Sequence, residues 1–213
     1  MGLVSAPAAR PGAGVPGARV AAVVLAAGMS TRMGVLKQLL PLGGRTMVER
    51  AVEPLVGMAE PICVVVGHRA AEVAAALRGW PVECVYNQRF GEGMLTSVQS
   101  GICAAPGAVG YLVCLGDQPG LSRGLVEAVL RAAGEAGRGI VVPTFGGRRG
   151  HPVYFAARYR DEVLALGLER GLNVVTRGHP ADTLELGVPD PQIVTDIDTP
   201  EDYAAFLRRT PGE

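Results

Sequence analysis

Glycine, hydroxyl and basic residues gather in a short stretch that follows the first apolar run of the chain. Gly28 and Gly34 allow the backbone to turn sharply and to approach a ligand closely. Arg32 and Lys37, together with the exposed N–H groups of such a loop, suit a polyphosphate. The stretch is therefore predicted to be a phosphate-binding loop. An ordinary turn between a strand and a helix, with two solvated cations, would contain the same residue types.

Spacing excludes two familiar nucleotide-binding loops. A Walker loop needs Gly-Lys-Ser/Thr after a glycine and four other residues, but Met33 stands five positions after Gly28. A dinucleotide fingerprint needs a second glycine two positions after the first, and the chain has Ser30 there. The predicted phosphate loop is of a different kind.

An acidic residue follows a later apolar run. Asp117 comes directly after the run at residues 111–115, within Gly-Asp-Gln-Pro. Because ligands of an open α/β sheet bind at the carboxyl ends of the strands, we expect Asp117 on the same rim as Arg32 and Lys37. There it can bind Mg²⁺, which accompanies a nucleoside triphosphate and takes one or two carboxylates. A structural turn in which Asp117 only accepts from local N–H groups is the alternative.

The stretch at residues 25–52 carries a more specific signal. It reads LAAGMSTRMGVLKQLLPLGGRTMVERAV and resembles the N-terminal signature of the MobA-like NTP transferases, which include the molybdenum cofactor cytidylyltransferases. The residues that match the signature are Leu25, Ala26, Ala27, Gly28, Arg32, Met33, Gly34 and Lys37. Guanylyl-transferring relatives usually carry Gly-Gly in place of Ala27-Gly28, which favours cytosine here.

The resemblance implies roles for these residues. Arg32, Lys37 and Asp117 are expected to be catalytic, the two cations on the triphosphate and Asp117 on the metal. The segment GEGMLTSVQSG resembles a GMxxS segment of the family that touches the base and ribose, whereas an ordinary helix N-terminus is the alternative. The expected nucleotide-binding residues are Leu25, Ala26, Ala27, Gly28, Met29, Ser30, Thr31, Arg32, Lys37, Gly93 and Ser97.

A second acidic segment, DIDTPEDY, resembles the C-terminal motif of the family, whose acidic or amide residue helps to bind the metal. Asp196 and Asp198 alternate around Ile197 and would share one face of an extended segment. Asp198 is the predicted second metal ligand, and Asp196 is the second choice. The segment also suits a plain turn before a capped helix.

The acceptor is predicted to bind at Arg149, Gly150 and His151, because Arg-Gly-His-Pro resembles an element found near the acceptor in cytidylyltransferases of this group. Arg148, Arg149 and His151 are residue types that receive an anionic phosphate, although a basic hairpin tip can also simply face water. A family stretch of the form GD-x-GAR has no match here, since residues 168–175 read LERGLNVV. The acceptor is therefore less well defined than the nucleotide.

The resemblance spans about residues 20–207 and implies a Mg²⁺-dependent nucleotidyltransferase that transfers CMP from CTP to molybdenum-loaded molybdopterin. Several alternatives stay open: methylerythritol phosphate or a sugar phosphate as acceptor, the same pterin with GTP, or a non-catalytic carrier of the finished cofactor. Transient contact with a molybdenum hydroxylase or its maturation factor is a further expectation.

Composition restricts the function classes. The formal net charge is +0, so the electrostatic footprint of a nucleic-acid or anionic-membrane binder is missing. No apolar run approaches the roughly 20 residues that span a bilayer. Residues 1–18 are rich in Ala, Gly and Pro and are predicted to be a disordered tail, and residues 19–210 a single nucleotidyltransferase domain. A cytoplasmic location is expected, with Cys63, Cys84, Cys103 and Cys114 as buried free thiols.

Apolar runs alternate with helical patterns along most of the chain. Strands are predicted at residues 20–27, 62–66, 82–86, 111–115, 140–144, 152–155, 183–186 and 193–195. Helices are predicted at residues 47–57, 70–77, 159–166 and 168–176. Three more are predicted by one end only: a helix that ends at residue 104, one that begins at about residue 122, and one that begins after residue 199. This order predicts an α/β fold with a doubly wound, mostly parallel sheet, similar to the Rossmann-like nucleotidyltransferases, and a small acceptor lobe at the C-terminal side.

Overall fold

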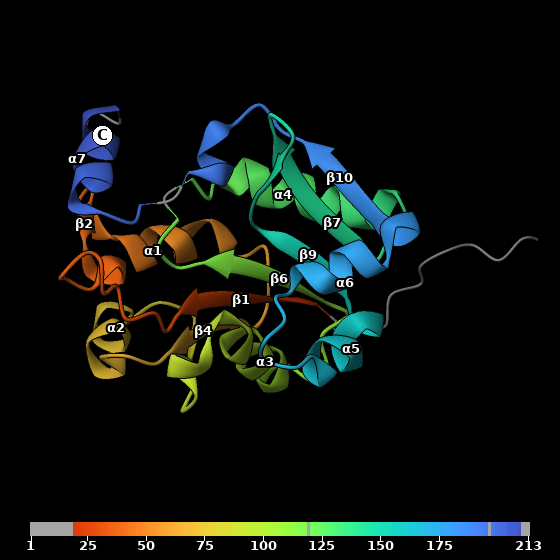
Figure 1. The fold of residues 1–213 in the computed structure, drawn as a ribbon, viewed down its shortest axis with the longest axis horizontal. Coiled ribbons are helices and arrows are strands. Elements are labelled where there is room, and N and C mark those ends of the chain that lie inside the picture. The colour runs from red at the N-terminus through yellow and green to blue at the C-terminus, as the bar shows by residue number, and fades with distance from the viewer. Residues whose placement is uncertain (1–18, 119, 196, 210–213) are drawn as a thin grey trace, which may run out of the picture.

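One mixed sheet runs through the middle of the molecule and separates two layers of helices (Figure 1). The computed structural model describes residues 19–118, 120–195 and 197–209. The strands of the sheet are β1 Val20–Ala26, β4 Ile62–Val66, β5 Glu83–Tyr86, β6 Gly110–Leu115, β7 Ile140–Phe145, β8 Arg148–Arg149, β9 Val153–Ala156 and β10 Thr183–Gly187. A small hairpin is formed by β2 Pro41–Leu42 and β3 Arg45–Thr46.

The strand order is β10-β7-β9-β6-β1-β4-β5, with β8 paired to β7. β1 lies between β4 and β6 and is parallel to both, and β10 is parallel to β7. Only β9, among the long strands, runs against its neighbours β6 and β7. The prediction of a doubly wound, mostly parallel sheet is confirmed. The C-terminal part, expected as a lobe over the sheet, supplies β7, β9 and β10 to that same sheet.

Seven α-helices are described: α1 Met47–Val52, α2 Ala70–Ala76, α3 Met94–Ala104, α4 Arg123–Glu135, α5 Arg160–Ala165, α6 Asn173–Gly178 and α7 Pro200–Arg209. Alternate residues of β1 enter two separate hydrophobic clusters. Ala22 and Val24 pack with side chains of α1, α2 and α4, whereas Ala21 and Val23 pack with α3, α5 and α6. Because both faces of β1 are covered, the strand shows no polar alternation in the sequence.

Three predicted helix starts are found. Thr46 forms a capping box with Glu49 at the start of α1, and Ser122 accepts from the backbone N–H of Leu125 at the start of α4. The Thr199 hydroxyl accepts from the backbone N–H of Asp202 at the start of α7. These side chains satisfy N–H groups that a helix leaves unbonded at its first turn.

Three predicted boundaries were wrong. α1 ends at Val52, and residues Glu53–Leu55, which include a proline, continue as a 3-10 turn. The helix expected at residues 168–176 begins only at Asn173. The strand expected at residues 193–195 is part of a 3-10 turn, η6, at Pro191–Val194. Asp190 accepts from the backbone N–H of Gln192, which holds that chain in a turn.

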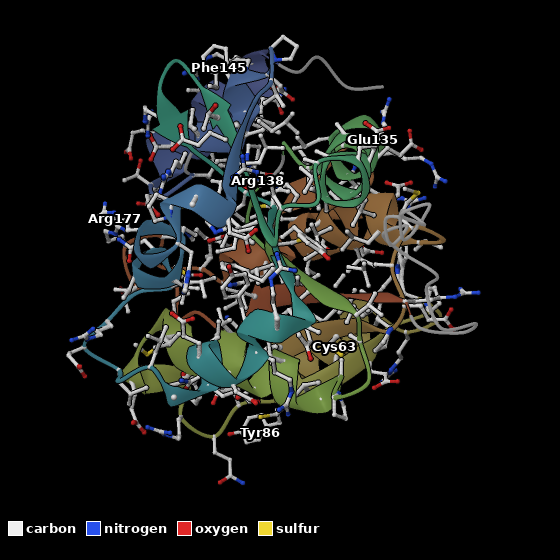
Figure 2. The ribbon with its side chains drawn as sticks, turned by 90° about the vertical axis from the view of Figure 1, so that its right-hand side faces the viewer. Cys63, Tyr86, Glu135, Arg138, Phe145 and Arg177 are labelled. Atoms are coloured by element: carbon white, nitrogen blue, oxygen red, sulfur yellow. The ribbon has the colours of Figure 1, made fainter. Side chains whose placement is uncertain are left out.

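The four cysteines are free, but only Cys63 and Cys114 are buried. Burial raises the pKa of the Cys63 thiol to about 11, and Figure 2 shows this residue among packed side chains. Cys84 and Cys103 are exposed, so the expectation of four buried thiols was wrong. Cys84 is exposed because β5 is an edge strand of the sheet, and Tyr86 at the end of the same strand points outward (Figure 2).

The predicted tail at residues 1–18 lies outside the described residues. Within the described part of the chain, none of the helices is both long and apolar enough to cross a bilayer.

Candidate active site

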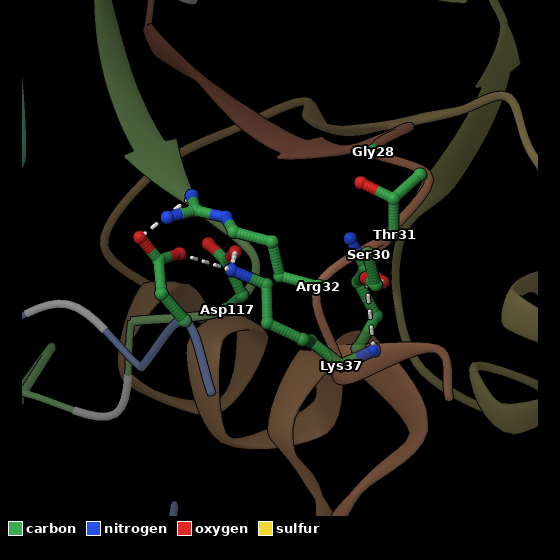
Figure 3. Close-up of a pocket in the computed structure, with 8 residues that line it drawn as sticks. Gly28, Ser30, Thr31, Arg32, Lys37 and Asp117 are labelled. Carbon is green, nitrogen blue, oxygen red and sulfur yellow. Dashed lines mark hydrogen bonds and ion pairs between the residues drawn. The ribbon is translucent and has the colours of Figure 1, made fainter. Parts of the chain in front are cut away.

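Two cations and two carboxylates meet at the carboxyl ends of the central strands (Figure 3). The ammonium nitrogen of Lys37 lies 2.8 Å from Oδ2 of Asp117 and 3.0 Å from Oδ1 of Asp198. Arg32 Nη2 lies 2.7 Å from the other carboxylate oxygen, Oδ2, of Asp198. We call these four residues the Lys37 cluster. The sequence predicted that they would meet at one rim.

Parallel pairing explains how two of its members come together. β1 and β6 are adjacent and parallel, so the loops that follow them leave the sheet at the same edge. The backbone N–H of Gly116 donates to the carbonyl of Leu25 at 2.9 Å, which ties the end of β6 to the end of β1. Asp117 is the next residue along the chain and therefore lies beside the loop that carries Lys37.

Asp198 reaches the cluster from a distant part of the chain, 161 residues from Lys37. The segment that carries it continues into α7, which packs against the region of the β2–β3 hairpin. Ile197 and Phe206 form a small buried cluster with Leu42 and Met47. The hydroxyl of Tyr203 on α7 donates to the carbonyl of Pro41. These contacts hold Asp198 over the phosphate loop.

The phosphate loop itself has a constrained backbone. Ser30 has φ of 52°, in the left-handed region that non-glycine residues seldom adopt, and Gly34 has φ of 68°. The Ser30 hydroxyl accepts from the backbone N–H of Lys37 at 3.0 Å. Because this bond joins the two ends of the loop, it fixes the turn from which Arg32 and Lys37 project.

Charge pairing sets the protonation state of the cluster. Burial acts to lower the pKa of Lys37, but the charges and hydrogen bonds of Asp117 and Asp198 outweigh it and raise that pKa above its ordinary value. The hydrogen bond from Lys37, with the charges of Lys37 and Arg32, outweighs burial and lowers the pKa of Asp198. Lys37 is therefore a cation and Asp198 an anion throughout the neutral range.

Two cavities meet at this cluster. The first is polar and is lined by Gly28, Ser30, Thr31, Arg32, Lys37, Gln38, Asp117 and Asp198. The second is more apolar and is lined by Leu25, Ala27, Gly28, Met29, Gln38, Phe90, Gly91, Gly93, Met94, Ser97, Leu115 and Asp117. They share Gly28, Gln38 and Asp117, so they lie next to each other, one with a charged lining and the other with a largely apolar lining. That division matches the two parts of a nucleoside triphosphate.

A third cavity adjoins the same charged residues on another side. Lys37, Asp117 and Asp198 line it together with Met94, Leu115, Gln118, Thr195 and Ile197. Gln118 is buried, and its amide nitrogen donates to the carbonyl of Ile193 at 2.6 Å. Gln118 is thereby fixed to the η6 turn, and the third cavity opens beside the Lys37 cluster.

The structure brings together all but one of the residues predicted to bind nucleotide. Leu25, Ala27, Gly28, Met29, Ser30, Thr31, Arg32, Lys37, Gly93 and Ser97 line the first or the second cavity. Ala26 is the exception: it lies within β1, is 0% exposed, and packs into the core against the face of α1. Asp196, the second choice for the metal, lies outside the described residues.

The residues predicted to bind the acceptor lie apart from these cavities. Arg149 is exposed and pairs with Glu185 at 2.6 Å, and it also donates to the Thr176 hydroxyl at 3.1 Å. A side chain at Gly150 would meet the carbonyl oxygen of Ile193 at 2.4 Å, so glycine is needed there for close packing. The hairpin therefore supports the η6 turn that also holds Gln118.

His151 is enclosed by the folded chain, and this affects its charge. Burial lowers the pKa of His151 to about 4, although the charge of Asp117 acts in the opposite direction. The imidazole is therefore neutral at pH 7, and the acceptor role of His151 stays a prediction. A neutral imidazole can still donate one hydrogen bond.

The sequence did not identify several residues in or beside the cavities, among them Gln38, Phe90 and Asn87. Gln38 is 2% exposed and lines both parts of the nucleotide-shaped space. Phe90 lines its apolar end. Asn87 is buried, and its amide nitrogen donates to the hydroxyls of Thr96 at 2.8 Å and Ser97 at 3.0 Å. The available signal for Asn87 was its position directly after a predicted strand, where polar side chains reach the ligand rim.

The donor set of the site fits a hard divalent cation. Asp117 and Asp198 offer carboxylate oxygens on either side of one ammonium group, and both side chains are partly exposed. Within the described residues, no group of three or more His, Cys, Asp or Glu side chains could hold a metal by itself. Mg²⁺ needs no such group, because it is bound by one or two carboxylates together with substrate phosphates and water.

A family model described as MobA-like NTP transferase domain matches residues 22–183. The nicotine blue oxidoreductase of Paenarthrobacter nicotinovorans is 35% identical over 88% of this chain and 96% of that protein. A probable molybdenum cofactor guanylyltransferase of Mycobacterium marinum is 32% identical over 89% of this chain and 94% of its own length. The molybdenum cofactor cytidylyltransferase of Escherichia coli is 25% identical over 88% and 95%.

A solved structure has the same arrangement. A nucleotidyl transferase from Methanothermobacter superposes with a TM-score of 0.79 and is 28% identical, and the match covers 91% of this chain and 98% of that one. The similarity extends over the whole sheet and both helix layers and is not limited to the nucleotide loop.

Proposed function

Because the chain belongs to the MobA-like NTP transferase domain family, we propose that it is a Mg²⁺-dependent nucleotidyltransferase that transfers CMP from CTP to molybdenum-loaded molybdopterin. The observation that carries the proposal is the Lys37 cluster, in which two cations and two carboxylates stand where a polar and an apolar cavity join. A carrier of finished cofactor would need neither a triphosphate loop nor two metal-binding carboxylates beside it.

The reaction follows from these groups. A terminal phosphate oxygen of the acceptor forms a bond to the α-phosphorus of CTP. The bond from that phosphorus to the β-phosphate oxygen breaks, and pyrophosphate leaves with the electron pair. No protein nucleophile is needed, and the rate comes from positioning and charge stabilisation.

Each charged residue has a part in this step. Arg32 and Lys37 exchange their carboxylate partners for phosphate oxygens and stabilise the charge that grows on the departing pyrophosphate. Asp117 and Asp198, released by the same exchange, would hold Mg²⁺. When bound, Mg²⁺ supplies Lewis-acid stabilisation of the phosphate oxygens. His151 is not needed as a base, because a phosphate acceptor is already ionised at pH 7.

The nucleoside is proposed to occupy the second cavity, with its base toward Ala27, Phe90 and Ser97. The acceptor is proposed to approach Asp117 through the third cavity. Of the predicted acceptor residues, His151 is the one whose pKa responds to the charge of Asp117. Support for cytosine comes from Ala27-Gly28 and from the cytidylyltransferase relative, whereas the more identical guanylyltransferase relative keeps GTP as the alternative.

Redox chemistry is a second candidate, because the relative named nicotine blue oxidoreductase has the highest identity of the three relatives described above. Oxidation of NADH or NADPH in the presence of a dye acceptor would test it. A redox reaction has no need of the Lys37 cluster, so the Asp117→Asn variant would keep that activity and lose nucleotidyl transfer.

The direct test is a pyrophosphate-release assay with each nucleoside triphosphate and each phosphorylated acceptor. We expect CTP to exceed GTP in kcat/KM by at least about tenfold with molybdenum-loaded molybdopterin, because a pocket shaped for a pyrimidine leaves polar groups of guanine unpaired. Competition between the two nucleotides, with products separated by chromatography, gives the ratio. An excess of guanine product would contradict the base assignment and leave the metal and phosphate roles intact.

A further inference from the structure

Gln38 is a buried amide at the junction of the two nucleotide-shaped cavities. Its side chain is 2% exposed, and it lines both the polar cavity and the apolar one. Among the residues that the structure describes, Gly28 and Asp117 are the others that line both cavities. Gln38 follows Lys37 in a 3-10 turn at Lys37–Leu39, so its backbone is fixed by the same loop that places the ammonium group.

A chain of hydrogen bonds sets the direction of this amide. The backbone N–H of Lys37 donates to the Ser30 hydroxyl at 3.0 Å. That hydroxyl therefore keeps its own hydrogen, which it donates to the amide oxygen Oε1 of Gln38 at 3.4 Å. These hydrogen bonds engage the amide oxygen of Gln38 and leave its amide nitrogen Nε2 available to another acceptor.

The amide nitrogen has no protein acceptor within the described residues, and it is not among their fully enclosed unpaired atoms. It therefore faces the space that Gln38 lines. An amide left without a partner after burial costs free energy, so such a donor points to an acceptor supplied by the ligand.

The ligand atom follows from the order of groups in a nucleoside triphosphate. The polar cavity, with Arg32 and Lys37, suits the β- and γ-phosphates, and the apolar cavity suits the nucleoside. The group that connects these two parts is the α-phosphate, and Gln38 stands at the connection beside Asp117. We propose that Gln38 Nε2 donates a hydrogen bond to a nonbridging oxygen of the α-phosphate and stabilises it during nucleotidyl transfer. This inference rests on the proposed function.

The Gln38→Met variant tests the role, because methionine has a similar length and no donor. We expect kcat to fall by roughly a hundredfold, as for removal of one donor to a reacting oxygen, with the KM for CTP within about threefold. Gln88→Met is the matched control, because Gln88 is exposed and lies outside the three cavities, and it should keep full activity. Wild-type kcat in Gln38→Met would overturn the proposal.

Phosphorothioate substrates identify the atom. The two diastereomers of CTPαS replace one or the other nonbridging α-oxygen with sulfur, a weak acceptor. We expect the ratio of their kcat values to differ between the wild type and Gln38→Met. An unchanged ratio would overturn the assignment to the α-phosphate.

The substrate 2′-deoxy-CTP distinguishes a contact of Gln38 with the α-phosphate from a contact with the ribose. If Gln38 bound the ribose hydroxyl, Gln38→Met would cost little with this substrate, and that outcome would also overturn the proposal. An equal loss with CTP and 2′-deoxy-CTP supports it.

Different experimental outcomes would contradict the Gln38 contact and the proposed nucleotidyltransferase function. If the chain were not a nucleotidyltransferase, the wild type would release no pyrophosphate with any acceptor. Binding of the non-reacting α,β-methylene analogue of CTP, measured by calorimetry, would still report on the contact. Gln38→Glu, which places a carboxylate beside the phosphates, should weaken that binding by at least about tenfold. Unchanged binding would overturn the contact independently of catalysis.

Discussion

Two clusters in this molecule pair carboxylates with basic side chains. They lie at opposite ends of the strands, and they differ in how completely their polar groups are bonded within the protein. The Lys37 cluster lies where β1 and β6 end. The other, which we call the Asp182 cluster, lies where β7 and β10 begin. In it Asp182 accepts from the backbone N–H of Gly139 at 3.0 Å, from Arg158 at 2.6 Å and from the Tyr159 hydroxyl.

The two clusters differ in whether all of their polar groups are used in bonds within the protein. Asp182 has both carboxylate oxygens occupied by groups of the protein, and its bonds join β10 to the chain before β7 and after β9. In the Lys37 cluster, Lys37 itself bonds two carboxylates, but the charged groups also line three cavities. They lie near the amide nitrogen of Gln38, which has no protein acceptor among the described residues. Complete bonding identifies a structural tie, whereas charged groups that also face a cavity identify a ligand site.

The largest expected effect separates the two clusters by activity. Asp117→Asn should lower kcat/KM by about a thousandfold or more, because it removes one of the two carboxylates that are proposed to hold Mg²⁺. Its melting temperature should stay close to that of the wild type, since the residue lies at a rim and not in the core. Steady-state kinetics with saturating Mg²⁺ and thermal unfolding give both values. The control is Asp161→Asn, whose side chain is 94% exposed. Full activity in Asp117→Asn would remove the distinction.

The cations come next in order of effect. Arg32→Ala and Lys37→Ala should each lower kcat/KM by about a hundredfold, because each removes a contact that strengthens as charge moves to the pyrophosphate. Arg78→Ala, at an exposed position outside the cavities, is the control for loss of an arginine. If the two variants changed thermal stability and left kinetics unaltered, the Lys37 cluster would be a structural tie like the Asp182 cluster.

Asn87 offers an intermediate case, since it is fully bonded but holds a residue of the pocket. Asn87→Ala releases the hydroxyls of Thr96 and Ser97 and the backbone N–H of Arg89. We expect kcat/KM to fall by about tenfold through misplacement of Ser97. Gln88→Ala is the neighbouring exposed control. Kinetics identical to wild type would show that Ser97 needs no such support.

The smallest effect on activity is expected at Asp182. Asp182→Asn should leave kcat/KM within about twofold of wild type and lower the free energy of unfolding at pH 7 by about 2 kcal/mol. Burial acts to raise the pKa of Asp182, but hydrogen bonds from Tyr159 and Arg158 outweigh it and lower that pKa from 3.8 to about 2.

The pH dependence of this stabilisation has a definite sign. A folded-state pKa below the unfolded value gives stability above about pH 4 that is lost as the pH falls toward about 2. Denaturant unfolding of wild type and Asp182→Asn at pH 7 and pH 3 should show a smaller difference at pH 3. A difference that grew on acidification would contradict the assignment.

Local signals in the sequence were enough for the fold and for much of the site. The β1 strand and the loop from Gly28 to Lys37 are continuous in the chain, so their residue types could be interpreted together. Asp117 was found because the end of a parallel strand has a known place in an open sheet. The Thr46 and Ser122 caps were also found, because a cap bonds within three residues of itself.

Long-range packing accounts for what the sequence did not reveal. Gln38 looked like an ordinary polar neighbour of Lys37 until the fold enclosed it between two cavities. Arg149 looked free to bind an anion, but Glu185 from β10 pairs with it, and that strand is 36 residues away. The neutral state of His151 likewise follows from burial by the folded chain. Short apolar stretches such as residues 193–195 fit a strand as well as a turn, and only the surrounding bonds decide.

The position of Asp198 has a consequence for how the protein is made. Lys37 and Asp117 lie in the part of the chain that leaves the ribosome early, whereas Asp198 emerges with α7 near the end of the described residues. Because domains grow from the N-terminus during synthesis, the sheet around β1 can assemble while the fourth member of the Lys37 cluster is still in the exit tunnel. A nascent chain would thus bring Lys37 and Asp117 together before Asp198 joins them. The Lys37 cluster would be complete only when the segment that carries Asp198 and α7 docks.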